Sequence, residues 1–314
     1  MARAYRPLDG VLLFDNPLEL TSNITLQKVR RLFQAEKAGH TGTLDPLATG
    51  LLPVCFGEAT KFSNALLDAD KSYRATVRLG QTTATGDAEG EVIAEHEVTA
   101  TRDQVHTVLA QFRGAIQQLP PMYSALKHQG KPLYEYIRNG ETVHRELRDV
   151  VIYELLLNGF TGNELDISVR CSKGTYIRTL GEDIGAALGC GAHLTALRRT
   201  AIAHFDLQAG YTLAQLIEMN EVERAACLLP VDSLLPTMPK LRLDAMQIKR
   251  MAQGQRLGLD TGLPDGRVSL YGAQGFVGVG LLQGRRLAPE RLLSGVAKQA
   301  ATTTAGADTD YLQP

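Results

Sequence analysis

The chain has 314 residues, 44% of them hydrophobic, and its formal net charge is −1. The length favours two domains, and the hydrophobic content excludes a disordered chain because it can form a sizeable core. The four cysteines are scattered without a Cys-x-x-Cys pair, which argues against a disulfide framework and a zinc site. We therefore expect no metal.

The charge of the chain is segregated. Residues 240–295 contain nine Lys or Arg against four acids, whereas residues 86–103 contain six acids and one Arg. Such segments cancel in the total, so the net charge does not exclude a nucleic-acid partner. The N-terminus lacks a long apolar segment, and no apolar run approaches 18 residues. We therefore expect a cytoplasmic protein that does not enter a membrane.

The first predicted elements are a buried strand and a basic helix. Residues 10–15, GVLLFD, form an apolar run that ends in a turn at Asn16 and Pro17. A helix is predicted over residues 24–34, with Ser22 or Asn23 as its N-cap. Its apolar side chains share one face, so its basic side chains remain for solvent or for phosphate.

Residues 37–61 are a shaped loop rich in Gly and Thr that contains one candidate catalytic group. Asp45 is the only carboxylate between Lys37 and Gly57, and Pro46 directs its backbone away from the helical region. A lone Asp-Pro is usually a turn residue that hydrogen-bonds its own backbone. Here the neighbours are apolar, and a carboxylate in such surroundings needs a charged or hydrogen-bonding partner.

A helix over residues 59–68 and a strand over residues 71–80 are expected next. In the strand, Tyr73 alternates in phase with the apolar Ala75 and Val77, so its ring points inward. It is either an ordinary core tyrosine or a ring at the mouth of a pocket, where a flat base can stack.

A helix is predicted over residues 103–113, and residues 119–149 follow with a different composition. They mix three tyrosines with Lys, Arg and His, and Pro132 (as N1) and Gly140 (as C′) bracket a short helix. Aromatic rings interleaved with cations suit an element that clasps RNA. An ordinary surface insertion remains the alternative.

An alternating strand over residues 165–171 leads into a helix from Ile177 to Gly189. Arg178 therefore lies in the first helical turn, where the helix dipole disfavours a cation. It is either an exposed arginine or one held by a special partner.

The alternation of strands and helices predicts an α+β fold with a mixed sheet flanked by helices. Further helices are expected over residues 212–229, and a Pro-rich run marks a boundary near residue 235. Residues 236–295 are predicted to form a small basic β domain, and residues 296–314, rich in Ala and Thr, a disordered tail.

Several motifs resemble those of TruB-type tRNA pseudouridine synthases, over residues 10 to about 205. They are GHTGTLDPLATGLLPVCFGEATKF, LGQTTATGDAEG, PPMYSALK, CSKGTYIRTL and GCGAHLTALRRTAIAHF. The chain departs from the family at Asn16 and Glu19, where the family has Lys and Gly.

The resemblance implies a catalytic domain over residues 1–235 with an RNA-contacting insertion at 119–149, and a PUA-like domain over 236–295. It implies isomerisation of uridine to pseudouridine at position 55, in the T-loop of tRNA. Asp45 would be the nucleophile, paired with Arg178, and Tyr73 would stack on the flipped base. Further candidates for substrate binding are His40, Tyr176, Leu197 and Lys61.

The mechanism stays open at this stage, because attack at C1′, attack at C6 and removal of the C2′ proton are all available to a carboxylate. Since no phosphate-binding or dinucleotide motif is present, we expect no cofactor. The expected partner is the tRNA T-arm, bound by a monomer. The alternatives are a non-catalytic tRNA-binding protein or RNA chaperone, and a nucleoside hydrolase that uses Asp45 as nucleophile.

Overall fold

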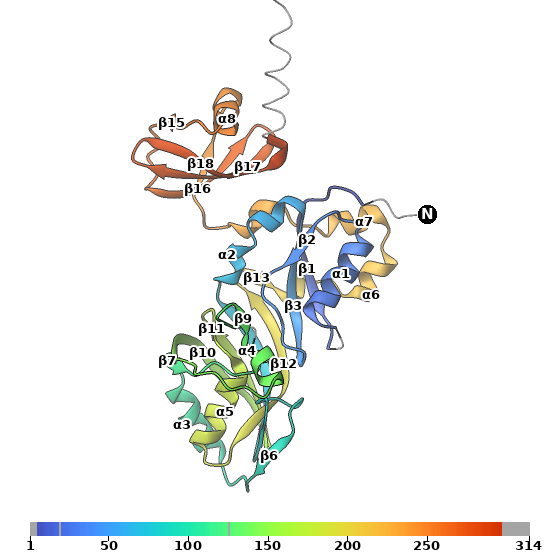
Figure 1. Ribbon diagram of the computed structural model, residues 1–314, viewed down its shortest axis with the longest axis vertical. Coiled ribbons are helices and arrows are strands. Elements are labelled where there is room, and N and C mark those ends of the chain that lie inside the picture. The colour runs from blue at the N-terminus through green and yellow to red at the C-terminus, as the bar shows by residue number, and fades with distance from the viewer. Residues whose placement is uncertain (1–4, 19, 125, 297–314) are drawn as a thin grey trace, which may run out of the picture.

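The computed structural model describes residues 5–18, 20–124 and 126–296 (Figure 1). The predicted tail and Glu19 lie outside this range, except for Val296. Within the described ranges, every helix is too short or too polar to cross a membrane.

A nine-stranded mixed sheet forms the larger part of the molecule. Seven strands follow the order β1-β3-β12-β4-β11-β10-β7, with β2 added to β3 and β13 to β12. The strands are β1 (Gly10–Asn16), β2 (Ala38–His40), β3 (Ala48–Phe56), β4 (Lys71–Leu79), β7 (Gly114–Gln118), β10 (Arg148–Thr161), β11 (Glu164–Cys171), β12 (Ala192–Ile202) and β13 (Phe205–Asp206). All pairs are antiparallel except β3 with β12, so the predicted mixed sheet with flanking helices is confirmed.

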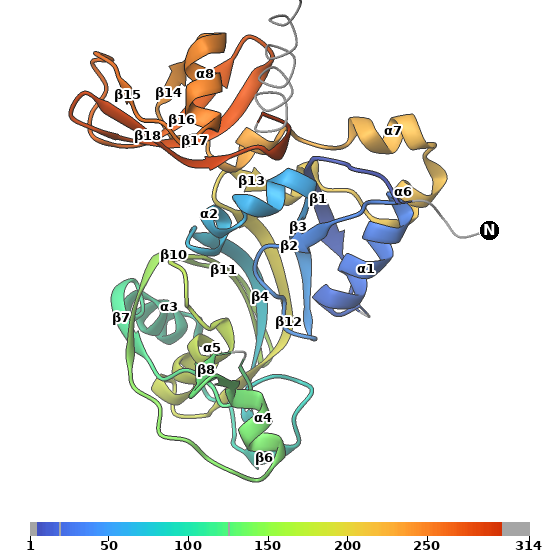
Figure 2. The same cartoon turned by 45° about the horizontal axis from the view of Figure 1, so that its top comes forward.

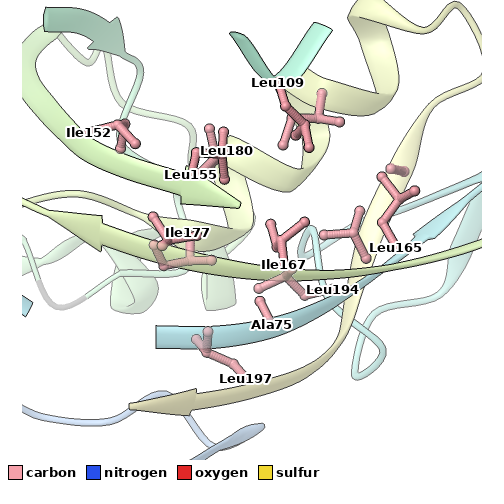
Figure 3. Packing of buried hydrophobic residues seen from close by; sticks show 14 of the residues in the cluster. Ala75, Leu109, Ile152, Leu155, Leu165, Ile167, Ile177, Leu180, Leu194 and Leu197 are labelled. Carbon is pink, nitrogen blue, oxygen red and sulfur yellow. The ribbon is translucent and has the colours of Figure 1, made fainter. Parts of the chain in front are cut away.

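Two helices cover one face of this sheet, α3 (Arg102–Gln111) and α5 (Ile177–Ala187). Figure 3 shows Leu109 of α3 and Leu180 of α5 meeting the strand residues Ile167 and Leu165. These side chains are fully buried, and each contributes about 1.5–3 kcal/mol of burial free energy. The packing fixes the start of α5, where Arg178 lies.

The β1–β3 end of the sheet is covered on both faces. Helices α1 (Ser22–Leu32) and α6 (Leu213–Glu218) pack against the side chains of Leu12 and Val54. The short helix α2 (Asn64–Leu67) packs against the opposite face. Strands β3 and β12 approach closely at Gly50, whose φ is +99°. A Cβ atom there would lie 2.3 Å from the carbonyl oxygen of Arg199, so this contact requires glycine.

Residues 240–292 form a separate five-stranded sheet with the order β14-β16-β17-β18-β15. Its strands are β14 (Lys240–Arg242), β15 (Leu257–Gly258), β16 (Gly266–Gly272), β17 (Gly275–Gln283) and β18 (Arg286–Leu292), and α8 (Ala245–Ala252) packs on it. Figures 1 and 2 both place this sheet at the α2 end of the larger one. The expected small C-terminal β domain is therefore present.

The remaining elements are short. They are β5 (Gln81–Thr83), β6 (Val92–Glu95), β8 (Lys127–His128), β9 (Lys131–Pro132), α4 (Leu133–Arg138) and α7 (Glu221–Ala226), with 3-10 turns at Gly57–Lys61, Leu207–Ala209 and Val231–Leu234. Helix α4 occupies the predicted insertion, with Pro132 as its N-cap rather than its first residue.

Two further local predictions were wrong. Helix α1 is capped by Thr21, whose hydroxyl accepts from the backbone N–H of Ile24, because Ser22 already lies in the first turn. The helix predicted over residues 59–68 is broken at Phe62, whose ring packs edge-on against Phe276 of the C-terminal sheet at 5.5 Å. A tertiary contact therefore overrides the local helical pattern.

Asn16, at a position where the family has Lys, is fully buried at the end of β1. Its amide donates to the carbonyls of Pro17 (3.0 Å) and Leu20 (2.9 Å), and its oxygen accepts from the Thr25 hydroxyl. In this chain, the side chain at position 16 closes the turn that precedes α1.

Candidate active site

Asp45 lies on the loop that joins β2 to β3. The backbone N–H of Leu44 donates to the Ser22 hydroxyl at 2.9 Å, and the Asp45 carbonyl accepts from the Ala48 N–H at 2.8 Å. Leu44 itself is buried in the core. The loop is thus fixed on both sides of Asp45, whose side chain remains 40% exposed.

Arg178 forms an ion pair with Asp45. Its Nη2 atom lies 2.9 Å from the Asp45 Oδ2 atom, although the two residues belong to distant parts of the chain. The arginine side chain is only 5% exposed. A guanidinium in this position keeps a carboxylate oriented and favours its ionised form.

A second carboxylate shares this guanidinium. The Asp87 Oδ2 atom lies 3.4 Å from Nη1 of Arg178, and the Asp87 side chain is almost fully buried. Asp87 is held by the Thr85 hydroxyl at 2.5 Å and by the backbone N–H of Glu89 at 3.2 Å. Arg178 is therefore held between a half-buried acid and a buried one.

Two backbone carbonyls complete the environment of Arg178. Its guanidinium donates to Thr85 at 3.2 Å and to Tyr123 at 2.7 Å. Tyr123 belongs to the insertion of residues 119–149, so this segment contacts the arginine directly. The arrangement ties three separate loops to one cation.

The pKa of the Asp45 carboxyl group depends on its burial and on two neighbouring charges. Burial raises the pKa of Asp45, Arg178 opposes that shift, and the negative charge of Asp87 adds to it. The net effect is a raised pKa, so the loss of one neighbouring charge shifts the pKa of Asp45. Such balance is frequent in catalytic groups.

Tyr73, on β4, faces Arg199 on β12 across the strand ladder. Burial raises the pKa of Tyr73 to about 12, while the positive charge of Arg199 opposes that rise. The negative charge of Asp45 also raises the pKa of Tyr73, so the phenol and the carboxylate belong to one site. The structure pairs Asp45 with Arg178 directly, and Tyr73 lies within range of the charge of Asp45.

The other predicted substrate-binding residues differ in their burial and contacts. Leu197 lies on β12 on the same face as Tyr73, and it is 8% exposed. His40 is half-buried on β2, where burial and the charge of Arg199 lower its pKa. Tyr176 immediately precedes α5, and its backbone N–H and carbonyl are both hydrogen-bonded by the side chain of Gln118. Their roles in substrate binding remain predictions.

Lys61 lies elsewhere, at the contact with the C-terminal sheet. Its ammonium group donates to Glu58 (2.8 Å), to the Leu292 carbonyl (3.0 Å) and to the Ser294 hydroxyl (2.9 Å). The structure gives Lys61 a role in joining the two sheets and does not bring it to the Asp45–Arg178 pair.

Sequence reasoning missed two residues of the site, Asp87 and Arg199. Asp87 was counted within a run of six acids, although its position between Gly86 and Ala88 sets it apart from the glutamates that follow. Arg199 shares a strand face with the apolar Leu197, and a charged residue on an apolar face was the available signal.

Comparisons with known proteins agree with this architecture. Three family models match the chain: TruB family pseudouridylate synthase (N terminal domain) over residues 30–177, tRNA pseudouridylate synthase B C-terminal domain over 178–236, and pseudouridine synthase II TruB, C-terminal, over 239–293. The chain thus has the architecture of a pseudouridylate synthase.

Two relatives, both named tRNA pseudouridine synthase B, are similar over most of their length. The protein from Azoarcus sp. (strain BH72) is 55% identical over 289 residues, which cover 92% of this chain and 96% of that one. The protein from Chromobacterium violaceum is 55% identical over 297 residues, covering 93% and 97%. The chain belongs to the TruB family of pseudouridylate synthases.

A solved structure supports the same fold at lower identity. The crystal structure of a Cbf5-Nop10-Gar1 complex contains a chain that is 26% identical, with a TM-score of 0.69, covering 90% of this chain and 84% of that one.

Proposed function

We propose that this protein isomerises uridine to pseudouridine in tRNA, at position 55 of the T-loop. The observation that carries the proposal is the 2.9 Å pair between Asp45 and the buried Arg178, inside a chain of the TruB family. Asp45 is the nucleophilic carboxylate, and Arg178 fixes its direction.

The reaction conserves every atom of the base and the sugar. The N1–C1′ bond breaks, the detached uracil turns, a C5–C1′ bond forms, and the proton at C5 leaves while N1 gains one. A carboxylate that is 40% exposed is accessible to a nucleotide, whereas the buried arginine behind it is not. The accessible Asp45 can therefore act as the nucleophile, and the buried Arg178 can hold its carboxylate in place.

The detached base must be held while it turns. In our proposal the Tyr73 ring stacks on the uracil, a type of contact worth about 1–3 kcal/mol per base. Leu197 contacts the other side of the base, Tyr176 lines the pocket, and His40 keeps the loop open beside the flipped nucleotide. Extrusion of the base costs a few kcal/mol, which RNA contacts elsewhere must supply.

We further propose that a catalytic domain (residues 1–235, with the insertion 119–149) and an RNA-binding domain (236–295) hold the T-arm together. The basic composition of the second segment supports phosphate contacts. The enzyme would act as a monomer in the cytoplasm and select the tertiary shape of the RNA rather than a base code.

The experiment follows tritium released from tRNA transcripts that carry [5-³H]uridine. We expect release from transcripts with an intact T-loop and none from transcripts in which the T-loop is deleted. A wild-type protein that binds both transcripts and releases no tritium would instead be an RNA-binding protein or RNA chaperone. Release that is independent of the T-loop would overturn the proposed substrate.

A further inference from the structure

Arg199 is a second buried guanidinium at the site, and it has no acidic partner among the described residues. It is 2% exposed and is among the largest fully buried side chains of the protein. The described ion pairs include Arg178 and Arg198 but not Arg199. Burying a charge without an ion-pair partner costs free energy, which the hydrogen bonds of the Arg199 guanidinium must offset.

Two of these contacts bracket the Asp45 loop. The Nε atom donates to the Leu51 carbonyl at 2.8 Å, and the Nη2 atom donates to the Gly42 carbonyl at 3.0 Å. Gly42 precedes Asp45 and Leu51 follows it, so one side chain fastens both ends of the loop. Gly42 has a φ of +75°, and a Cβ atom there would lie 3.4 Å from the Arg199 Nη1 atom.

The charge of Arg199 is also directed at Tyr73, its partner in the β4–β12 register. The groups that act on the Tyr73 hydroxyl are Arg199, Cys171 and Asp45, and Arg199 alone favours the phenolate. Burial lowers the pKa of His40 and of Lys71, and the charge of Arg199 lowers both further. The Arg199 charge therefore acts on several groups of the site, although no carboxylate among the described residues forms an ion pair with it.

We propose that Arg199 is a positioning residue that holds the Asp45 loop against β4 and stabilises negative charge on the Tyr73 oxygen. This charge is needed when that oxygen accepts the C5 proton of the turned base. The inference deepens the proposed function and rests on it.

The proton step balances as follows. After the C5–C1′ bond has formed, the C5–H bond breaks and its electron pair returns to the ring. The proton goes to the Tyr73 phenolate, which becomes a phenol and later returns this proton to water. Because the pKa of Tyr73 is about 12, the phenolate fraction at pH 7 is on the order of 10⁻⁵. Any loss of the Arg199 charge lowers that fraction further.

Two substitutions separate charge from packing. Arg199→Lys keeps the charge but loses the forked donation to both carbonyls, whereas Arg199→Gln keeps a donor and loses the charge. The substrates are tRNA transcripts with hydrogen or deuterium at C5 of uridine, and thermal unfolding monitors the fold. The readouts are the isotope effect on pseudouridine formation and the pH dependence of the rate of C5–H loss.

We expect Arg199→Gln to slow C5–H loss at least about tenfold, since one pKa unit of the phenol corresponds to tenfold in phenolate. The isotope effect of this variant should increase. The rise of its C5–H loss rate with pH should move to higher pH. Arg199→Lys should keep the wild-type isotope effect. In a Tyr73→Phe background, Arg199→Gln should add no further isotope effect.

Equal isotope effects in the Gln and Lys variants would overturn the inference, as would an additional effect of Arg199→Gln in the Tyr73→Phe background. Should the Gln variant not fold, the Lys variant decides, because an increased isotope effect there would show that retained charge does not help C5–H loss. A wild-type protein that forms no pseudouridine would refute the proposed function instead. If the wild type is active and substitution of Arg199 leaves the isotope effect unchanged, only this inference is refuted.

Discussion

Replacing Arg178 by Met should destabilise the protein and stop turnover for two separable reasons. The substitution leaves the Asp87 side chain, 3% exposed, without its cation. Removing one partner of a buried ion pair costs about 3–5 kcal/mol. Asp87 keeps its bonds from the Thr85 hydroxyl and the Glu89 N–H, so we expect the lower end, about 3 kcal/mol.

This loss corresponds to a decrease in Tm of roughly 6–12 °C for a domain of this size. Turnover should fall by about 10²–10³-fold or more, because the cation that orients the Asp45 carboxylate is gone. Circular dichroism measures the first effect, and tritium release from C5-labelled tRNA measures the second, at a temperature where the variant is folded.

The double variant Arg178→Met/Asp87→Asn separates the two effects. It removes the orphaned charge together with the cation, so much of the lost stability should return while turnover stays low. Unfolding of Arg178→Met at the wild-type temperature would contradict this prediction, because Asp87 would then not need the guanidinium. Turnover regained by the double variant would contradict it as well.

Three further substitutions test the site and its frame. Asp45→Asn should abolish turnover and leave the Kd for tRNA within about threefold, because binding depends on phosphate contacts. Filter binding measures this Kd. A parallel loss of affinity would contradict the assigned roles. Since only the carboxylate of Asp45 is nucleophilic, log(kcat/KM) should fall with unit slope as the pH falls through its raised pKa. Asp87→Asn removes a charge that raises this pKa, so the acid limb should move to lower pH in a pH–rate profile; movement to higher pH would contradict the electrostatic account. Gly50→Ala should lower the free energy of unfolding by about 2–5 kcal/mol, because its Cβ atom would meet the Arg199 carbonyl. The control Gly162→Ala, at a φ of +61° with nothing within 4 Å, should lower it by about 1–2 kcal/mol. Equal melting temperatures of the two variants would show that the β3–β12 contact adjusts.

Asp45 and Arg178 lie in distinctive local contexts in the sequence, and the resemblance to TruB-type synthases predicts that they pair, as they do in the structure. Asp45 is isolated in a Gly- and Thr-rich loop, and Arg178 stands where a helix dipole disfavours a cation. The Asp45 carboxylate needs a positive partner and the Arg178 guanidinium a negative one. In the structure each is the partner of the other. The strand alternation likewise indicates the inward direction of Tyr73.

The residues that support the site are not predictable in the same way. Asp87 acquires its role only because its loop folds back onto α5, a proximity that no local pattern encodes. Phe62 ends a helix because Phe276, far along the chain, offers it a ring contact. Lys61 is engaged by the C-terminal sheet for the same reason. Long-range packing decides these cases.

The central claim is that the Asp45 carboxylate, held by Arg178, rearranges a nucleobase without releasing it. The most direct measurement digests the reacted tRNA to nucleosides and quantifies uridine, pseudouridine and free uracil by chromatography. We predict that one uridine is lost and one pseudouridine gained per tRNA, with no free uracil and no conversion by Asp45→Asn. Free uracil in proportion to the uridine lost would contradict the account and indicate a hydrolase.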